Sequence, residues 1–314
     1  MDSKDPIVEQ TIDPKIDPAF KAVVREKELL LGLLNDIFEF LELPKGIDLD
    51  YTDTELDSIG YNGKSGRLDV VVKLDSERLI NVEMQIRNRF DIIERLQFYA
   101  GKLFINQFKK GKSHSMDQIL PTIVIGILAF SLNDYTEIKD QEMVHYFRFG
   151  DLKLGCELPG NKMTILTIEL PKLGTFLAKY GKTGLGYWTS FFRHAKTDLS
   201  LVKEYAMTAK AEDILKKKLD DDDFMRSYKE ARAILDDQES MLKTYADNAS
   251  RIAAKKARQE GRQEGRQEGR QEGRQEGKDA ERRIIISRLL QSGMTPQNIS
   301  KILGISEDEL NTLL

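Results

Sequence analysis

The chain has 314 residues, 40% of them hydrophobic and 32% charged, with a formal net charge of −4. This length suits one sizeable domain with further segments, and the acidic balance does not favour general nucleic-acid binding, so any such contact needs a local basic patch or a bridging metal ion. The single cysteine, Cys156, excludes an internal disulfide and predicts a reducing compartment such as the cytoplasm, while no apolar run approaches ~18 residues, so no membrane span is expected.

The N-terminal part predicts a loose arm, two helices and a strand. Residues 1–16 are polar, and Asp17-Pro18 then predicts an N-cap with a first-turn proline that opens a short helix. Apolar residues recur at helical spacing over residues 26–43, which predicts a core helix. Rough alternation over residues 47–57 predicts a first strand.

A hairpin is expected between Gly66 and Arg87. Two runs rich in Val, Ile and Leu flank Asp75-Ser76-Glu77, a pattern typical of antiparallel strands joined by a tight turn. With Ser76 at the centre of the turn, the opposed pairs on one apolar face are Leu68 with Met84, Val70 with Val82, and Val72 with Ile80.

The other face of this hairpin carries the candidate metal-binding and catalytic side chains. Asp69 lies opposite Glu83 there, and Gln85 follows on the same side. Opposed β-carbons lie roughly 4.5–5.5 Å apart, so the two carboxylates repel each other, and a divalent cation would remove that repulsion. Acidic residues on a solvated hairpin face are also common, and a slip of one residue would separate the two acids, so both interpretations stay open at this point.

A basic helix and three strands should follow. Residues 90–108 have helical period and carry Arg95 and Tyr99 one turn apart; this helix is either a phosphate-binding surface or a solvated face. Strands are expected at residues 120–130, 142–149 and 162–169. After them, the aromatic cluster around Trp188 predicts core packing more than a base-stacking platform.

The C-terminal third divides into three segments. Residues 201–255 are charged and helical, with a cap and loop at the acidic run 220–223. Residues 256–283 contain Arg-Gln-Glu-Gly repeated five times, which places no opposite charges three or four residues apart and adds five glycines that cost about 1 kcal/mol each, so a marginal helix or a flexible tether is expected.

Residues 284–314 predict a small helical unit with three helices. Its order resembles a helix-turn-helix, but the third helix begins with Glu307, Asp308 and Glu309 and has no Lys or Arg. This charge argues against reading of the major groove and favours dimerisation or docking, so a homo-oligomer formed through the C-terminal helices is expected.

These motifs carry a family resemblance that covers nearly the whole chain. Asp69 followed by Glu83-Met84-Gln85 resembles the Asp…Glu-x-Lys signature of the PD-(D/E)XK nuclease superfamily, with Gln in place of Lys. With Asp17-Pro18-Ala19-Phe20-Lys21 upstream, Arg95-x-x-x-Tyr99 downstream and the repeat-bearing tail, the chain resembles the Rpn family of recombination-promoting nucleases, also described as transposases of this type. The resemblance implies a restriction-endonuclease-like α/β core, a mixed sheet flanked by helices, in residues 1–200.

The resemblance also implies a reaction, the metal-dependent hydrolysis of a DNA phosphodiester. Asp69 and Glu83 would hold Mg²⁺, or Mn²⁺ or Ca²⁺, together with the backbone carbonyl of Met84, and Gln85 would complete the catalytic set. An amide neither accepts a proton near neutral pH nor adds positive charge, so Gln85 predicts slower activity, a second ion, or the substrate phosphate as base. The residues expected beside this centre, as supporting or DNA-contacting groups, are Asp17, Lys21, Arg67, Arg95 and Tyr99.

Two other functions compete with the nuclease. A catalytically inactive DNA-binding or assembly protein would keep the fold and use the tail to oligomerise. A structural coiled-coil adaptor would draw on the tail alone and have no affinity for DNA.

Overall fold

The structure is a computed structural model that describes residues 11–52, 68–88, 91–108, 115–134, 141–193, 199–306 and 308–310. It contains two compact units, residues 1–235 and residues 236–314. Several predictions fall wholly or partly outside the described residues: the first ten residues of the arm, the strand beyond residue 52, the site residue Arg67, and Glu307 and residues 311–314 of the C-terminal unit.

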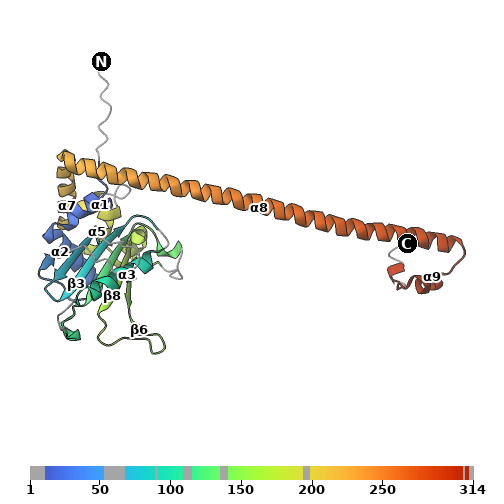
Figure 1. Cartoon of the computed structure of the whole chain (residues 1–314), viewed down its shortest axis with the longest axis horizontal. Coiled ribbons are helices and arrows are strands. Elements are labelled where there is room, and N and C mark those ends of the chain that lie inside the picture. Colours follow the sequence, from blue (N-terminus) through green and yellow to red (C-terminus); the bar gives the residue numbers. More distant parts are fainter. Residues whose placement is uncertain are drawn as a thin grey trace, which may run out of the picture. The chain divides into compact units, whose positions relative to one another are not determined.

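The first unit is built on a six-stranded sheet (Figure 1). In spatial order its strands are β1 (Leu49–Tyr51), β2 (Val70–Leu74), β3 (Arg78–Gln85), β4 (Thr122–Leu128), β8 (Met163–Glu169) and β5 (Val144–Arg148). Strands β1, β2 and β3 are antiparallel, β3, β4 and β8 are parallel, and β5 is antiparallel to β8. The expected mixed sheet flanked by helices is confirmed, and the parallel strands bring the carboxyl ends of β3, β4 and β8 to one edge.

The β2–β3 hairpin has the register that the sequence predicts. Val70 pairs with Val82, and Val72 with Ile80. The turn places Asp75 and Ser76 at φ 51° and 58°, left-handed values that a non-glycine residue adopts when hydrogen bonds support them. Such support is present at Asp75, whose carboxylate accepts hydrogen bonds from two backbone amides in the segment before β1.

One predicted pair is wrong. Strand pairing ends at Val70, because Asp69 lies in a bend that reverses the alternation of side chains. Leu68 therefore packs with Val71 and Leu79, in a different cluster from Met84.

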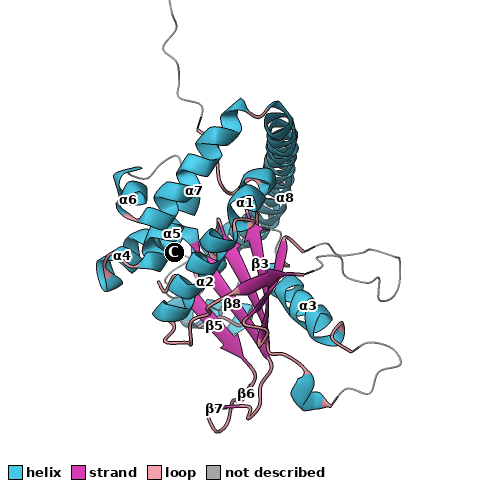
Figure 2. Cartoon of the chain, turned by 90° about the vertical axis from the view of Figure 1, so that its left-hand side faces the viewer, coloured by secondary structure: helices cyan, strands magenta, loops and turns pink. Residues whose placement is uncertain are grey.

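Helices cover both faces of the sheet (Figure 2). The helices of the larger core are α1 (Asp17–Val24), α2 (Lys27–Phe40), α4 (Leu173–Tyr180), α5 (Gly184–Arg193), α6 (Leu199–Glu204), α7 (Ala206–Lys217) and the start of α8 (Asp222–Gln291), which buries Tyr228. Helix α3 (Ile92–Ile105) covers the other face and buries Leu96 and Leu103 against Val71 and Val124. The hairpin is therefore buried on both sides, which places the acidic face in a water-poor environment.

Two details of the first unit differ from the sequence expectations. Ile16, not Asp17, is the N-cap of α1, and Asp17 is the first helical residue, so the predicted cap is wrong. A small ribbon of β6 (Gly150–Asp151) and β7 (Cys156–Glu157) was not expected, because its strands are too short to carry a periodic signal.

The core role of Trp188 is confirmed, since this residue is 1% exposed. The single-turn helices are η1 (Met116–Gln118), η2 (Leu132–Asp134), η3 (Leu170–Lys172) and η4 (Lys218–Asp220).

The repeat segment is helical. Helix α8 runs over Asp222–Gln291, and the boundary between the two units lies within it. Its start is capped by Asp221, whose Oδ1 accepts a hydrogen bond from the Phe224 amide at 3.0 Å, which confirms the expected cap in the acidic run.

The second unit ends in a small core of its own. Helix α9 (Pro296–Leu303) follows α8 and ends at Gly304, which adopts φ 65°. The buried residues of this core are Ile286, Ile299 and Leu310. No helix in the described part of the chain is both long enough and apolar enough to cross a membrane.

Candidate active site

Asp69, just before β2, and Glu83, near the end of β3, meet at one end of the hairpin. The Asp69 backbone amide donates a hydrogen bond to Glu83 Oε1 at 3.1 Å, and the Met84 amide donates to Asp69 Oδ2 at 3.1 Å. Each carboxylate thus accepts a backbone hydrogen bond from the other strand. The two acids lie close enough for the charge of Asp69 to raise the pKa of Glu83, and no lysine or arginine among the described residues forms an ion pair with either one.

This pair is electrostatically strained. Glu83 is 2% exposed. Burial, followed by the charge of Asp69, raises the pKa of Glu83 to about 8. Burial also raises the pKa of Asp69, although the Met84 amide and Lys21 oppose that rise. At neutral pH the pair therefore retains a proton unless a cation takes its place.

Asn81 is a site residue that the sequence analysis missed. It is fully buried, and its Nδ2 donates a hydrogen bond to Glu83 Oε1 at 3.0 Å. Asn81 Oδ1 has no hydrogen-bond partner among the described residues. The available signal was the alternation on β3, which puts residues 81, 83 and 85 on one face.

Gln85 and Arg95 extend the site toward α3. Gln85 Nε2 lies 3.4 Å from Glu83 Oε2, and Arg95 Nη1 donates to Gln85 Oε1 at 3.3 Å. Arg95 Nη2 donates a hydrogen bond to the Tyr99 hydroxyl at 3.0 Å. Because Tyr99 lies one helical turn further along α3, this bond holds the guanidinium in position. The charge of Arg95 also lowers the pKa of Asp69 and of Glu83, although both values remain raised.

Helix α1 contributes a third group of charges. Lys21 and Asp17 form an ion pair of 2.6 Å. Lys21 lowers the pKa of Asp69 and Asp17 raises it, which places the start of α1 within electrostatic range of the carboxylate pair. The structure thus brings together every predicted site residue except Arg67, which lies outside the described residues.

The donor set fits a hard divalent cation. Hydrogen bonds occupy Glu83 Oε1 and Asp69 Oδ2, and among the described residues Asp69 Oδ1 accepts none and Glu83 Oε2 only the long one from Gln85. Carboxylate oxygens are the preferred ligands of such ions, and a bound positive charge would lower the pKa of both acids. No cluster of three or more His, Cys, Asp or Glu able to hold a metal occurs in the described ranges, so main-chain oxygen or water must supply the other ligands.

A comparison with known families identifies the family of this chain. The model of the PD-(D/E)XK nuclease family transposase matches residues 14–255, which include the whole six-stranded sheet and every residue of the candidate site. Neither the curated proteins nor the solved structures contain a significant match. PD-(D/E)XK nucleases generally use divalent metal ions. The chain belongs to the PD-(D/E)XK nuclease family transposases, which are nucleases linked to transposition.

Proposed function

We propose that the chain is a metal-dependent DNA endonuclease that hydrolyses phosphodiester bonds in recombination or transposition, as its resemblance to the Rpn family implies. The observation that carries this proposal is the pair formed by buried Glu83 and half-buried Asp69, both with raised pKa values. Maintaining two carboxylates at such a site is costly for a structural protein, and perturbed pairs of this kind are concentrated at functional sites.

Asp69 and Glu83 would hold Mg²⁺, with Mn²⁺ or Ca²⁺ as alternatives, together with the carbonyl oxygen of Met84. When bound, such an ion polarises a phosphoryl oxygen and lowers the pKa of a bound water. Asn81 keeps the Glu83 carboxylate in place by its 3.0 Å hydrogen bond to Oε1, which would leave Oε2 to bind the ion.

Arg95 supplies the positive charge that Gln85 lacks. The usual lysine of the superfamily adds a cation beside the scissile phosphate, whereas Gln85 orients a water by hydrogen bonds alone. The guanidinium of Arg95 lies 3.3 Å from Gln85 Oε1 and remains charged at any working pH, so it stabilises the developing phosphoryl charge without acting as a base. The proton of the attacking water then passes to solvent or to the substrate phosphate.

DNA is the proposed partner, and the positive groups around the site would contact its phosphates. Lys21 on α1 and Arg95 on α3 approach the carboxylates from two elements, which suits a phosphate held between them. Dimerisation or docking through residues 284–314 stays a proposal, as does a cytoplasmic location.

The test is nicking of supercoiled plasmid by purified full-length chain with Mg²⁺, Mn²⁺ or Ca²⁺. Wild type is expected to nick with at least one ion, and Asp69→Ala and Glu83→Ala to lose that activity. Asp50→Ala is the matched control, because Asp50 is an exposed carboxylate on β1 of the same sheet. Cleavage that persists in both site variants, or none by wild type with every ion, would reject the proposal.

Gln85 favours a second candidate, a DNA-binding protein that keeps the fold without catalysis. That candidate predicts DNA binding that weakens with salt, and no cleavage with any of the three ions.

A further inference from the structure

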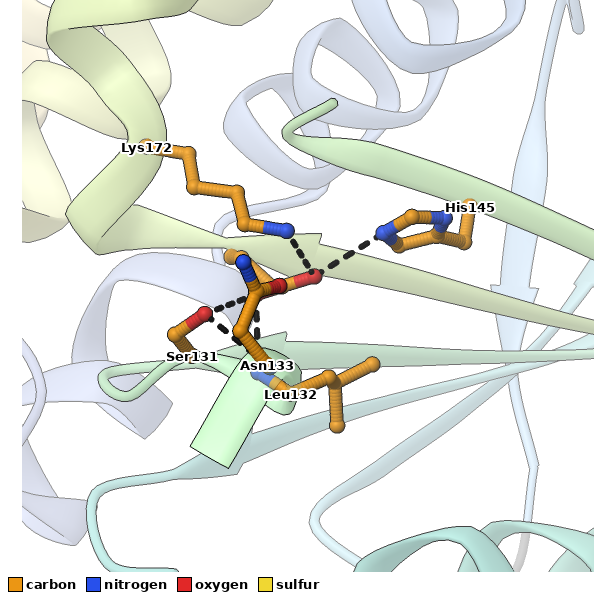
Figure 3. A network of polar contacts seen from close by, with 6 residues as sticks. Ser131, Leu132, Asn133, His145 and Lys172 are labelled. Atoms are coloured by element: carbon orange, nitrogen blue, oxygen red, sulfur yellow. Dashed lines mark hydrogen bonds and ion pairs between the residues drawn. The ribbon is translucent and has the colours of Figure 1, made fainter. Parts of the chain in front are cut away.

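A second buried carboxylate lies outside the proposed active site. Glu169 is the last residue of β8 and is fully buried. Its Oε2 accepts hydrogen bonds from Ser131 Oγ at 2.9 Å and from the Leu132 amide at 2.8 Å. Its Oε1 lies 2.9 Å from His145 Nε2 and 3.0 Å from Lys172 Nζ, and Figure 3 shows these groups converging from separate segments. Because a carboxylate only accepts, His145 Nε2 carries a proton.

The Glu169 carboxylate is ionised at neutral pH. Burial acts to raise its pKa, but the hydrogen bonds from His145, Leu132, Lys172 and Ser131 together hold the pKa below its ordinary value. A charged, fully satisfied group in a water-poor site forms strong hydrogen bonds, so it fixes the segments that donate to it.

One of those segments leads directly to the active site. Ser131 and Leu132 lie just after β4, in the stretch that begins with Ala129. The Ala129 amide donates a hydrogen bond to the Gln85 carbonyl at 2.9 Å. Leu128 pairs with Gln85 on one side and with Glu169 on the other, and a spacing of about 4.8 Å between strands puts these two residues roughly 10 Å apart.

We propose that Glu169 is a positioning residue for the active site: by holding Ser131 and Leu132, it keeps Ala129 bonded to the Gln85 carbonyl and so fixes the end of β3. This inference rests on the proposed nuclease function. It assigns a role to a cluster whose members come from four segments, the turn after β4, β5, β8 and η3.

The end of β3 is sensitive to such support. Gln85 contacts Glu83 Oε2 at 3.4 Å and Arg95 Nη1 at 3.3 Å, both near the upper limit for a hydrogen bond. A small shift of this strand end breaks both contacts. Displacing a catalytic group by about 1 Å is enough to cost up to about 100-fold in rate.

The experiment compares two variants that each remove one donor from Glu169. Ser131→Ala removes the bond on the side of Ala129, and His145→Phe removes the bond on the side of β5 while keeping an aromatic ring. Hydrogen exchange at the Ala129 amide, kcat, KM and thermal stability are measured for both variants and for wild type.

Ser131→Ala is expected to speed hydrogen exchange at the Ala129 amide by about 10-fold, because the hydrogen bond from this amide to the Gln85 carbonyl opens more often. It should lower kcat by on the order of 10-fold, with KM within about twofold of wild type. His145→Phe should leave Ala129 exchange and kcat within about twofold of wild type. This holds even if its thermal stability falls as much as that of Ser131→Ala.

Unchanged Ala129 exchange in Ser131→Ala would overturn the inference, and so would equal losses of kcat in the two variants, which would indicate general destabilisation. The exchange measurement requires no catalysis. If wild type does not nick DNA, the proposed function fails, while Ala129 exchange still decides whether Glu169 holds the end of β3.

Discussion

Replacing Glu83 by Gln should remove a pH-dependent weakness from the metal-free protein. The pKa of Glu83 rises from 4.5 to about 8 on folding. A folded-state pKa above the unfolded value favours the native state at low pH, and that contribution is lost as pH rises from the unfolded to the folded value. At 1.36 kcal/mol per pKa unit, the full loss is about 5 kcal/mol. Wild type should therefore become less stable between about pH 4.5 and 8.

The assay is urea denaturation with EDTA at several pH values across that window. Glu83→Gln keeps an oxygen to accept from the Asp69 amide and Asn81, so its free energy of unfolding should vary much less with pH. Added Mg²⁺ should restore wild type at high pH by about 2.7 kcal/mol at a concentration of 100 times Kd, and should not stabilise the variant comparably. Glu39→Gln is the control, because Glu39 is an exposed carboxylate on α2.

The reasoning is refuted if wild type and Glu83→Gln lose stability in parallel across this range. Equal stabilisation of both proteins by Mg²⁺ would refute it as well.

Three further predictions concern Arg95, Trp188 and the glycines of α8. Arg95→Ala should lower kcat by about 100-fold, because an electrostatic donor beside the phosphoryl group is removed, and Arg95→Lys should recover part of that loss; equal single-turnover rates in all three proteins would contradict this role. Trp188→Ala should cost about 3–5 kcal/mol in urea denaturation, since the buried ring also donates to Asp36 Oδ2 at 2.9 Å; a loss under 1 kcal/mol would contradict it. Gly265→Ala and Gly269→Ala should each stabilise α8 by about 1 kcal/mol, because nothing lies within 4 Å of the added methyl group; circular dichroism melts that do not rise would disagree.

Much of the sheet could be predicted because its signals are local. The tight turn at Asp75-Ser76-Glu77 and the alternating apolar runs fix the hairpin register, so the pairing of Val70 with Val82 follows from sequence alone. The pairing itself ends at Val70, and the Asp69 amide reaches Glu83 Oε1 at 3.1 Å from the bend before β2. Strands expected at residues 120–130 and 162–169 appear as β4 and β8.

The features that were missed depend on contacts between distant segments. The bend at Asp69 sends Leu68 to the α3 face, which only the packing of α3 reveals. Glu169 reaches partners up to 38 residues away in sequence, and their convergence depends on the order of β4, β8 and β5 in the sheet. Asn81 was not predicted as a site residue, because the only sequence signal for its hydrogen bond to Glu83 is that residues 81 and 83 alternate onto one face of β3.

The helix in the repeat segment could not be predicted by summing helix propensities and charge pairs within the repeat alone. Five glycines and unfavourable charge spacing predict at best a marginal helix, and the structure nonetheless has α8 continuous over Asp222–Gln291. Continuity with the helical residues on both sides removes the cost of starting a helix within the repeat, which favours propagation through it.

The central claim is that Asp69 and Glu83 together hold a divalent ion, and calorimetric titration with Mn²⁺ tests it most directly. Wild type at pH 7 should bind about one ion per chain and release protons, because the pair that retains a proton must give it up. Asp69→Asn and Glu83→Gln should each abolish this binding, while the control Asp50→Asn should retain it. Binding of Mn²⁺ that is unchanged in both site variants, or absent from well-folded wild type, would contradict the account.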